Sequence, residues 1–372
     1  MRSMPRGIVV GLVVGWLLVL ATPARTQQVA QQPQQQAAAL GLDNPRVIEV
    51  MTVQDAVTPY LMGQPEVIGT ATGLADDGEV AIIVLVNDES PGAAQAVVRL
   101  NGRIEGVAVR ARLTDPIVAF KGKPGGGGGV SHTAKQAPPI QLGTSGGWRN
   151  DLANGYCCGG TLGALILVGG QQRILSNYHV FEADIVNGGN GTTAQTGNPI
   201  IQPGLIDVGC IASSAQNVAT LVKSSSLPGS NVDASSATVI SGMVRTDGAI
   251  LEVGVPSSQT VTASLNQQVK KSGRTTGLTR SSVSGLNATI SVSYANECAG
   301  GTAFTKTFTG QILVANSLSK FLGSGDSGSL MLEDVSTSPR AVGLLFAGSS
   351  SIAVANPIGQ VLGFFNATMV GN

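Results

Sequence analysis

The sequence Gly-Asp-Ser-Gly-Ser-Leu at residues 325–330 places one serine between two glycines and directly after an acid. A serine hydroxyl is a weak nucleophile at neutral pH, so it needs a base to take its proton and donors to hold the oxyanion that follows. The flanking glycines allow a tight turn that can aim the N–H groups of Gly325 and Ser327 at one point. The same residue types also favour ordinary turns, so the motif alone leaves a catalytic and a structural interpretation open.

The chain has only two histidines that could act as the base. His132 follows a run of five glycines, where we expect a solvated linker residue. His179 lies near the end of the stretch 173–180, which a short glycine turn separates from the apolar stretch 161–168. This pattern predicts a β-hairpin with His179 where a strand gives way to a loop, a usual place for a catalytic group. A structural histidine at a strand end is the alternative.

The acid that would orient His179 must come from the few carboxylates between His179 and Ser327. Asp233 enters a run of small and β-branched residues, so we expect it to be partly buried at the start of a strand. A partly buried carboxylate needs a partner, and a histidine N–H would serve while fixing the imidazole tautomer. Asp207, in a glycine-bounded loop, is the second candidate.

The order His179, Asp233, Ser327 resembles that of chymotrypsin-like serine peptidases, and so do the residues around each of the three. Residues 271–277, Lys-Ser-Gly-Arg-Thr-Thr-Gly, are similar to the corresponding stretch of bacterial streptogrisin-type peptidases. The whole pattern also resembles the trypsin-like proteins of the plant narrow-leaf type. The resemblance covers roughly residues 156–368.

This resemblance implies a mainly β fold, a chymotrypsin-like double β-barrel with the active site in the cleft between the barrels. His179 and Asp233 would come from the first barrel and Ser327 from the second. The N–H groups of Gly325 and Ser327 would form the oxyanion hole. The partner would be a protein or peptide substrate, and no metal or organic cofactor would be needed.

The resemblance also implies where the substrate binds. Residues 343–348 resemble the strand that lines the primary specificity pocket of that family, which assigns substrate binding to Phe346, Ala347 and Gly348. In many relatives the residue six before the nucleophile sets the primary specificity. Phe321 holds this place here, which suggests a preference for an apolar side chain.

Two features of the chain depart from the family pattern. Tyr178 precedes the histidine, where the family usually has a smaller residue. The long N-terminal segment, while attached, would keep a mature N-terminus from inserting beside Asp326. We therefore expect an internal cation, Lys271 or Arg274, to hold the Asp326 carboxylate.

Composition limits the possible classes of protein. Charged residues make up 12% of the chain, the formal net charge is zero and no basic stripe is present, which argues against nucleic acid as a partner. Abundant glycine, scarce aromatic residues and frequent Val, Ile, Thr and Ser favour many short strands over long helices. The length of 372 residues suits two domains.

Residues 1–24 have the features of a signal peptide. Arg2 and Arg6 precede an apolar run from residue 8 to residue 20, and small residues suited to cleavage follow. The run is too short for a comfortable transmembrane helix, which needs about 20 apolar residues. We expect a secreted or periplasmic protein without stable membrane insertion after signal cleavage, and an uncleaved anchor is the alternative.

Export makes the four cysteines informative. An even number of cysteines in an exported chain indicates two disulfides, and the spacing and the lack of a nearby histidine argue against a metal site. The adjacent Cys157 and Cys158 rarely bond each other, because the ring would be strained. We expect Cys210 and Cys298 each to pair with one of them, in either arrangement.

The N-terminal part divides into a glutamine-rich low-complexity segment, 25–42, and a small α/β domain, 43–121. In that domain apolar residues recur at helical spacing from Val50 to Leu61, and Pro59 must bend or break this helix. Two runs around residues 75–78 then predict a β-hairpin, and an alternating run before residue 114 predicts a half-buried strand.

Residues 122–140, rich in glycine and proline, predict a flexible linker, and residues 141–372 form the peptidase domain implied by the resemblance. The N-terminal domain has two interpretations. It could be a pro-region that is removed at the linker, or it could remain as a domain that binds a substrate or partner.

The function that these observations favour is an exported serine endopeptidase using His179, Asp233 and Ser327. Two alternatives stay open. The extra N-terminal domain and Tyr178 would suit a catalytically idle binding module on a peptidase fold. An esterase of the G-D-S type is the other, although its serine usually lies near the N-terminus of an α/β chain.

Overall fold

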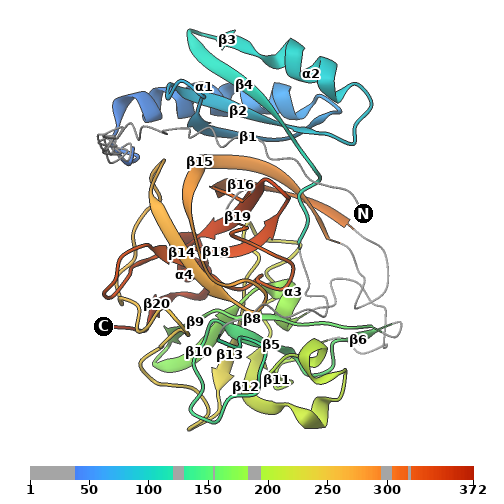
Figure 1. Cartoon of the computed structure of the whole chain (residues 1–372), viewed down its shortest axis with the longest axis vertical. Coiled ribbons are helices and arrows are strands. Elements are labelled where there is room, and N and C mark those ends of the chain that lie inside the picture. The colour runs from blue at the N-terminus through green and yellow to red at the C-terminus, as the bar shows by residue number, and fades with distance from the viewer. Residues whose placement is uncertain (1–37, 120–129, 154–155, 183–193, 295–303, 317–319) are drawn as a thin grey trace, which may run out of the picture. The chain divides into compact units, whose positions relative to one another are not determined.

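The computed structural model describes residues 38–119, 130–153, 156–182, 194–294, 304–316 and 320–372 (Figure 1). The predicted signal peptide, most of the low-complexity segment, the glycine run and Cys298 lie outside these residues. Within the part of the chain that the structure describes, no helix combines the length and the apolar character that a membrane span requires.

The N-terminal residues form a small α/β module, as expected. Asn44 caps its first helix, because the Asn44 side chain accepts hydrogen bonds from the N–H groups of Arg46 and Val47 and Pro45 opens the helix. The predicted hairpin is antiparallel, and a second helix connects two parallel strands. The elements are α1 Pro45–Met62, β1 Val67–Leu74, β2 Val80–Asn87, α2 Ala93–Leu100, β3 Gly102–Ile104 and β4 Val107–Thr114.

Pro59 does not break helix α1, which continues to Met62. A proline inside a helix removes one backbone hydrogen bond and crowds the preceding turn. Here it lies in the last turn, and buried residues on one face, Val47, Val50 and Leu61, pack the helix against the sheet. Tertiary packing therefore outweighs the local cost of the proline.

The last third of the chain forms a closed six-stranded barrel. Its strand order is β14-β17-β18-β19-β16-β15, and pairing of β14 with β15 closes the ring. The long strand β15 bends at several register shifts, so its first half pairs with β14 and its second half pairs with β1. The strands are β14 Gln268–Gly273, β15 Gly277–Tyr294, β16 Phe304–Ala315, β17 Leu330–Glu333, β18 Ala341–Gly348 and β19 Ile352–Pro357.

The middle of the chain forms the other curled sheet, in the order β20-β9-β10-β13-β12-β11-β5-β8. Strands β8 and β9 are consecutive and separated only by Gly163, so together they close this sheet into a barrel. Its strands are β5 Thr144–Trp148, β8 Gly160–Leu162, β9 Ala164–Val168, β10 Gln171–Ser176, β11 Pro199–Gln202, β12 Gln216–Val222, β13 Ser235–Val239 and β20 Ala367–Met369. The short strands β6 Leu152–Ala153 and β7 Tyr156–Cys157 pair separately.

The remaining helices are short, and α3, Tyr178–Phe181, carries a residue of the site. Helix α3 directly follows β10, and helix α4, Ile358–Phe365, follows β19. The 3₁₀ turns are Leu205–Val208 and Ala212–Ser214. The predicted hairpin of β9 and β10 is present, with Gly169 and Gly170 at positive φ in its turn. His179 follows it in helix α3 rather than in a loop.

The chain is thus mainly β, a chymotrypsin-like double β-barrel preceded by a small α/β module (Figure 1). The module does not have a hydrophobic core of its own. Val47 and Val84 of the module belong to one buried cluster with Val314 and Leu345 of the second barrel. Backbone pairing of β1 with β15 continues the barrel sheet into the module.

His132 corrects the expectation of a solvated residue in the linker. Its side chain is buried, with Nδ1 2.8 Å from the Gly143 carbonyl oxygen and Nε2 2.6 Å from Glu252 Oε2. Backbone bonds also hold the following segment, since Ile140 donates to Met243 and accepts from Arg245. The sequence around His132 is polar, and only the fold shows that distant partners satisfy its ring.

Candidate active site

His179 and Asp233 are in direct contact and both are buried. His179 Nδ1 lies 2.6 Å from Asp233 Oδ2, and the exposed fraction of the imidazole is 3%. The other carboxylate oxygen accepts the N–H groups of Tyr178 at 2.8 Å and of His179 at 3.4 Å. Because a carboxylate accepts, Nδ1 carries the hydrogen and Nε2 is left as the basic nitrogen.

Both residues owe their position to the first barrel. His179 lies in α3, immediately after β10, and Asp233 lies two residues before β13, which pairs with β10. The Asn177 side chain donates to the Asp233 carbonyl at 2.7 Å, and the Asp233 N–H donates to Asn356 Oδ1 at 2.9 Å. Asn356 belongs to β19, so the second barrel also anchors this acid.

Asp207 and Glu182 form ion pairs or hydrogen bonds with residues other than His179. Asp207 forms a two-point ion pair with Arg274, with distances of 2.7 Å and 2.6 Å, and accepts the Ser145 hydroxyl. Glu182, close to His179 in sequence, accepts hydrogen bonds from Ser224, Ser225 and Ser235. Of the two candidates, Asp233 is therefore the acid that contacts His179.

Ser327 lies in a tight turn just before β17. Gly325 and Gly328 have φ values of +97° and +93°, which favour glycine. Thr161 of the first barrel holds the turn, because its hydroxyl donates to the Gly325 carbonyl at 3.0 Å and its N–H donates to the Ser327 carbonyl at 2.9 Å. The turn is thus fixed against the first barrel.

Glycines of the first barrel let this turn approach closely. A Cβ atom on Gly163 would lie 1.9 Å from the Gly328 carbonyl oxygen. A Cβ atom on Gly160 would lie 2.6 Å from Val180 Cγ2 and 3.0 Å from the Ser327 carbonyl oxygen. Ser327 and the residue that follows His179 therefore pack on the same glycine, which brings the two halves of the site together.

The Ser327 hydroxyl bonds to the backbone of strand β18. Ser327 Oγ donates to the Phe346 carbonyl oxygen at 3.3 Å, and Ser327 is fully buried. His179 Nε2 is buried and has no hydrogen-bond partner among the described residues. The structure thus brings His179 and Asp233 into contact and places Ser327 nearby, without a hydrogen bond from Ser327 to that nitrogen among these residues.

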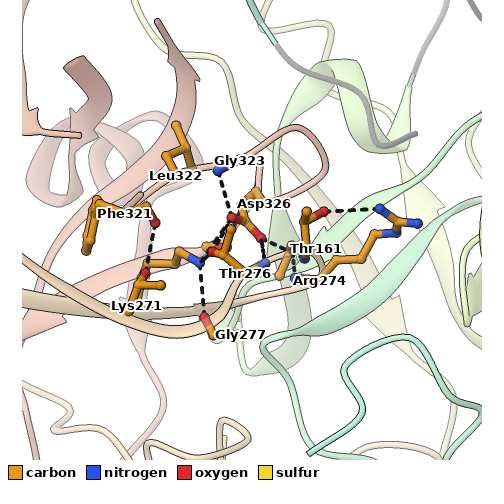
Figure 2. Close-up of polar contacts among 12 residues, drawn as sticks. Thr161, Lys271, Arg274, Thr276, Gly277, Phe321, Leu322, Gly323 and Asp326 are labelled. Atoms are coloured by element: carbon orange, nitrogen blue, oxygen red, sulfur yellow. Dashed lines mark hydrogen bonds and ion pairs between the residues drawn. The ribbon is translucent and has the colours of Figure 1, made fainter. Parts of the chain in front are cut away.

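Asp326 is held by Lys271, one of the two expected cations, as Figure 2 shows. Lys271 Nζ lies 3.1 Å from Asp326 Oδ2, and both side chains are completely buried. The carboxylate also accepts the N–H groups of Thr275 and Gly323 and the Thr276 hydroxyl, at 2.8, 2.9 and 2.6 Å. Arg274, the other expected cation, pairs with Asp207 instead.

Burial and charge act in opposite directions on Asp326. Burial by itself would raise the pKa of Asp326, but the Lys271 ammonium and the hydrogen bonds from Thr276, Gly323 and Thr275 hold that pKa below its ordinary value. The Asp326 carboxyl is therefore ionised at neutral pH. This ion pair fixes the turn that carries Ser327.

The strand predicted to bind substrate is largely buried. Phe346 and Ala347 are in β18 and belong to the same apolar cluster as Tyr178 and Ile117. Gly348 exchanges two backbone hydrogen bonds with Val118, both of 3.0 Å. The chain's own N-terminal segment therefore pairs with the end of this strand.

That pairing lies on the edge of β18 next to Ser327. Strand β17, which follows Ser327, pairs with this edge of β18 only up to Leu344. Beyond it, Leu345 forms backbone hydrogen bonds with Gly328 and Ser329. The segment 117–119 continues the edge at Gly348. Because it runs antiparallel to β18, its direction leads from Gly348 toward Phe346.

Phe321 does not support the expected specificity. It is fully buried and packs in the core of the second barrel with Met331 and Leu345, and its carbonyl accepts the Thr279 hydroxyl at 2.8 Å. The position of Phe321 six residues before Ser327 suggested a role in primary specificity, but its side chain lies in the core instead.

Sequence reasoning missed one residue of the site, Tyr294. Its hydroxyl donates to Asp233 Oδ2 at 2.9 Å, and its ring meets the His179 imidazole edge to face, with centroids 6.0 Å apart. Tyr294 ends strand β15 of the second barrel, 61 residues after Asp233. No motif surrounds it, so the sequence carries no signal for this contact.

The cysteines agree with the expected pattern as far as they are described. Cys157 and Cys210 form a disulfide, and Cys158 is disulfide-bonded as well. Cys298 lies outside the described residues. Within the described ranges, no group of three or more His, Cys, Asp or Glu side chains is arranged to hold a metal ion.

No protein-family model and no curated protein matches the chain. Among solved structures it is similar to a glutamic acid specific serine protease, with 16% identity over 62% of this chain and 100% of that chain and a TM-score of 0.40. It is similar to Thermobifida fusca Protease A, with 19% identity, 63% and 99% coverage and a TM-score of 0.41. Cellulomonas bogoriensis chymotrypsin shows 18% identity, 63% and 99% coverage and a TM-score of 0.38.

Proposed function

We propose that this chain is an exported serine endopeptidase that hydrolyses peptide bonds through His179, Asp233 and Ser327. The observation that carries the proposal is the buried His179–Asp233 contact of 2.6 Å beside the glycine-flanked turn of Ser327. An imidazole oriented by a carboxylate, next to a serine on a fixed turn, is the arrangement that activates a hydroxyl. The disulfide of Cys157 suits an exported protein.

In this proposal His179 Nε2 takes the proton of Ser327 Oγ while Oγ bonds to the substrate carbonyl carbon. The N–H groups of Gly325 and Ser327 hold the resulting oxyanion. His179 then gives the proton to the leaving amine as the peptide bond breaks, and water releases the acyl group by the reverse sequence. Asp233 stabilises the charged imidazole throughout. Metal or organic cofactors have no part in these steps.

We also propose that the substrate peptide binds along β18 as an added strand and that the attached N-terminal module blocks it. The hydrogen bonds between Val118 and Gly348 occupy the backbone groups that an extended peptide would use there. Side chains clamp the same segment, because Asp115 accepts the N–H and hydroxyl of Ser350 at 3.0 and 2.6 Å. The module, residues 43–121, then acts as an inhibitory region until it is displaced.

A binding module without catalysis is the second candidate. The observation that favours it is the Ser327 hydroxyl, which donates to the Phe346 carbonyl while His179 Nε2 is without a partner among the described residues. The proposed peptidase needs a hydrogen bond from the Ser327 hydroxyl to Nε2 when substrate is bound. A binding module would need no such bond.

Labelling with a fluorophosphonate probe tests the proposal and separates it from this rival. The full chain and its Val118→Pro variant, which loses the N–H donor to Gly348, are compared with the same chains carrying Ser327→Ala. We expect labelling that requires Ser327 and that Val118→Pro accelerates about tenfold or more, since each lost backbone hydrogen bond costs about 1 kcal/mol and the proline also cannot pair as a strand.

The matched controls are Ser336→Ala, an exposed serine outside the site, and Asp88→Ala, an exposed acid of the module. Neither is expected to change the labelling rate. Folded Val118→Pro protein that never labels at Ser327 would support the binding module instead.

A further inference from the structure

Tyr294 is the group outside the proposed triad that touches it most directly. The Tyr294 hydroxyl and His179 Nδ1 share one carboxylate oxygen, Asp233 Oδ2, at 2.9 and 2.6 Å. The other oxygen is occupied by the backbone N–H groups of Tyr178 and His179. Asp233 is completely buried, and in the described part of the chain no lysine or arginine forms an ion pair with it.

We propose that Tyr294 is a positioning residue that holds Asp233 in line with His179 and limits how much negative charge the imidazole meets. The proposal rests on the proposed peptidase function for its kinetic consequence. Its structural basis is independent of catalysis, because a buried carboxylate without a cation depends on neutral donors.

The Tyr294 ring is firmly held in this position. It stacks on Phe304, its register partner in β16, with centroids 4.7 Å apart and an angle of 9° between the rings. It also packs in the apolar cluster that contains Phe308 and Phe346. Few rotamers are open to a ring that is stacked and buried in this way, so the hydroxyl stays directed at Asp233.

The hydroxyl remains a donor over the working pH range. Burial, reinforced by the nearby Asp233 carboxylate, raises the pKa of Tyr294 well above its ordinary value. A buried tyrosine usually finds some acceptor, and a backbone carbonyl would satisfy it equally. This tyrosine influences the imidazole because its hydroxyl and His179 Nδ1 contact the same oxygen, Asp233 Oδ2.

The backbone next to Tyr294 connects it to the segment that covers the substrate strand. The Ser293 N–H donates to the Ile117 carbonyl at 2.9 Å, and the Ala119 N–H donates to the Ser293 carbonyl at 3.0 Å. The segment that pairs with Gly348 therefore also holds the residue before Tyr294. A peptide that replaces this segment would meet the same backbone groups.

The titratable groups that the described residues bring against His179 are Asp233 and Tyr294. Glu182, further along the chain, turns its carboxylate to Ser224 and Ser235. Removing the Tyr294 hydroxyl leaves more negative charge on Asp233 Oδ2. This charge favours the protonated imidazole, so His179 should keep its proton to higher pH.

NMR of ¹⁵N-labelled histidine tests this directly, because the chain has only two histidines and His132 serves as an internal reference. The measurement uses the full chain with Ser327→Ala, so that it does not depend on activity. We expect Tyr294→Phe to move the midpoint of the His179 titration upward by about one pH unit and to leave the His132 signal unchanged.

Two further variants distinguish the effect of the hydrogen bond from that of a loss of packing. Replacing Tyr294 by 3-fluorotyrosine, which keeps the ring and strengthens the donor, should move the His179 midpoint in the opposite direction. Tyr60→Phe makes the same chemical change on an exposed tyrosine, 69% accessible, and should have no effect. A loss of packing alone would not produce shifts of opposite sign.

The kinetic counterpart is measured in the Val118→Pro chain with Ser327 intact. Tyr294→Phe should lower kcat about tenfold with KM unchanged, because the residue touches no substrate. A His179 midpoint that is the same with tyrosine, phenylalanine and fluorotyrosine overturns the assignment whether or not the chain hydrolyses peptides. Absence of labelling at Ser327 together with shifted midpoints would count against the peptidase proposal only.

Discussion

Two buried aspartates lie in the site, and they are neutralised in different ways. Asp326 faces the Lys271 ammonium at 3.1 Å, and both side chains are completely buried. Asp233 has no ion-pairing lysine or arginine in the described part of the chain and is satisfied by neutral donors and one imidazole. A buried carboxylate with a fixed cation serves to hold structure, whereas one facing an imidazole can respond to a proton.

The difference fits the positions of the two acids. Asp326 belongs to the turn that carries Ser327, and Lys271, Thr276 and Gly323 converge on it (Figure 2). The Thr275 N–H donates to the same carboxylate. A turn that must present a nucleophile benefits from such rigidity. Among the described residues Asp233 has no such cation, so its negative charge can stabilise the imidazolium that forms during catalysis.

Asp233→Asn should have the largest effect on activity. The amide can donate to His179 Nδ1, which would favour the tautomer whose Nε2 carries the hydrogen, and kcat should fall by about 10⁴-fold. Steady-state kinetics with a peptide substrate, measured in the Val118→Pro chain, gives the result. The control is Asp207→Asn, which breaks the ion pair with Arg274. This variant should mainly lower the free energy of unfolding and have a much smaller effect on kcat than Asp233→Asn. An equal loss of kcat in Asp233→Asn and Asp207→Asn would mean that Asp233 has no special part in catalysis.

Lys271→Met should act on stability rather than on a single catalytic step. It leaves Asp326 buried without its cation, which costs about 3–5 kcal/mol in the free energy of unfolding. Urea denaturation measures this cost, and the double variant Lys271→Met, Asp326→Asn should recover part of it because no unpaired charge remains. A double variant that is no more stable than Lys271→Met would mean that the charge is not the cause.

Gly163→Ala tests whether the turn beside Asp326 must stay close to the first barrel. The new methyl group would meet the Gly328 carbonyl at 1.9 Å, so the turn must shift and kcat should fall about a hundredfold. Gly170→Ala is a control in the β9–β10 turn, where a Cβ meets no atom within 4 Å although the φ value still strains it. A crystal structure of Gly163→Ala with an unmoved Ser327 would contradict the prediction.

Acid titration should give the smallest and most specific effect. The folded pKa of Asp326 lies below its unfolded value, so its ion pair contributes stability that is present above about pH 4 and lost as the pH falls through the folded pKa. Thermal unfolding between pH 2 and pH 6 should show this loss in the native chain. In the Lys271→Met, Asp326→Asn chain the same pH range should show a shallower slope.

The family resemblance implied the double barrel, whereas local periodicity predicted the strands and the α/β module and the scarcity of histidine singled out His179. Only two histidines exist, and among the few acids between His179 and Ser327 the sequence favoured Asp233, at the start of an expected strand, over Asp207. The choice between Lys271 and Arg274 was beyond the sequence. Both lie within one short segment, and the structure places Lys271 in β14 beside Asp326 and Arg274 after the end of that strand beside Asp207.

By itself, then, the sequence determined which residues could do chemistry and that the chain would be rich in strands. The tertiary structure decided the contacts between distant segments: the burial of His132 against Glu252, the removal of Phe321 to the core, and the hydroxyl of Tyr294 on Asp233. It also decided that the N-terminal module continues the barrel sheet through β1 and β15. Such contacts depend on strand register and barrel closure, which arise from the packing of the whole chain. The local sequence around each residue therefore does not predict them.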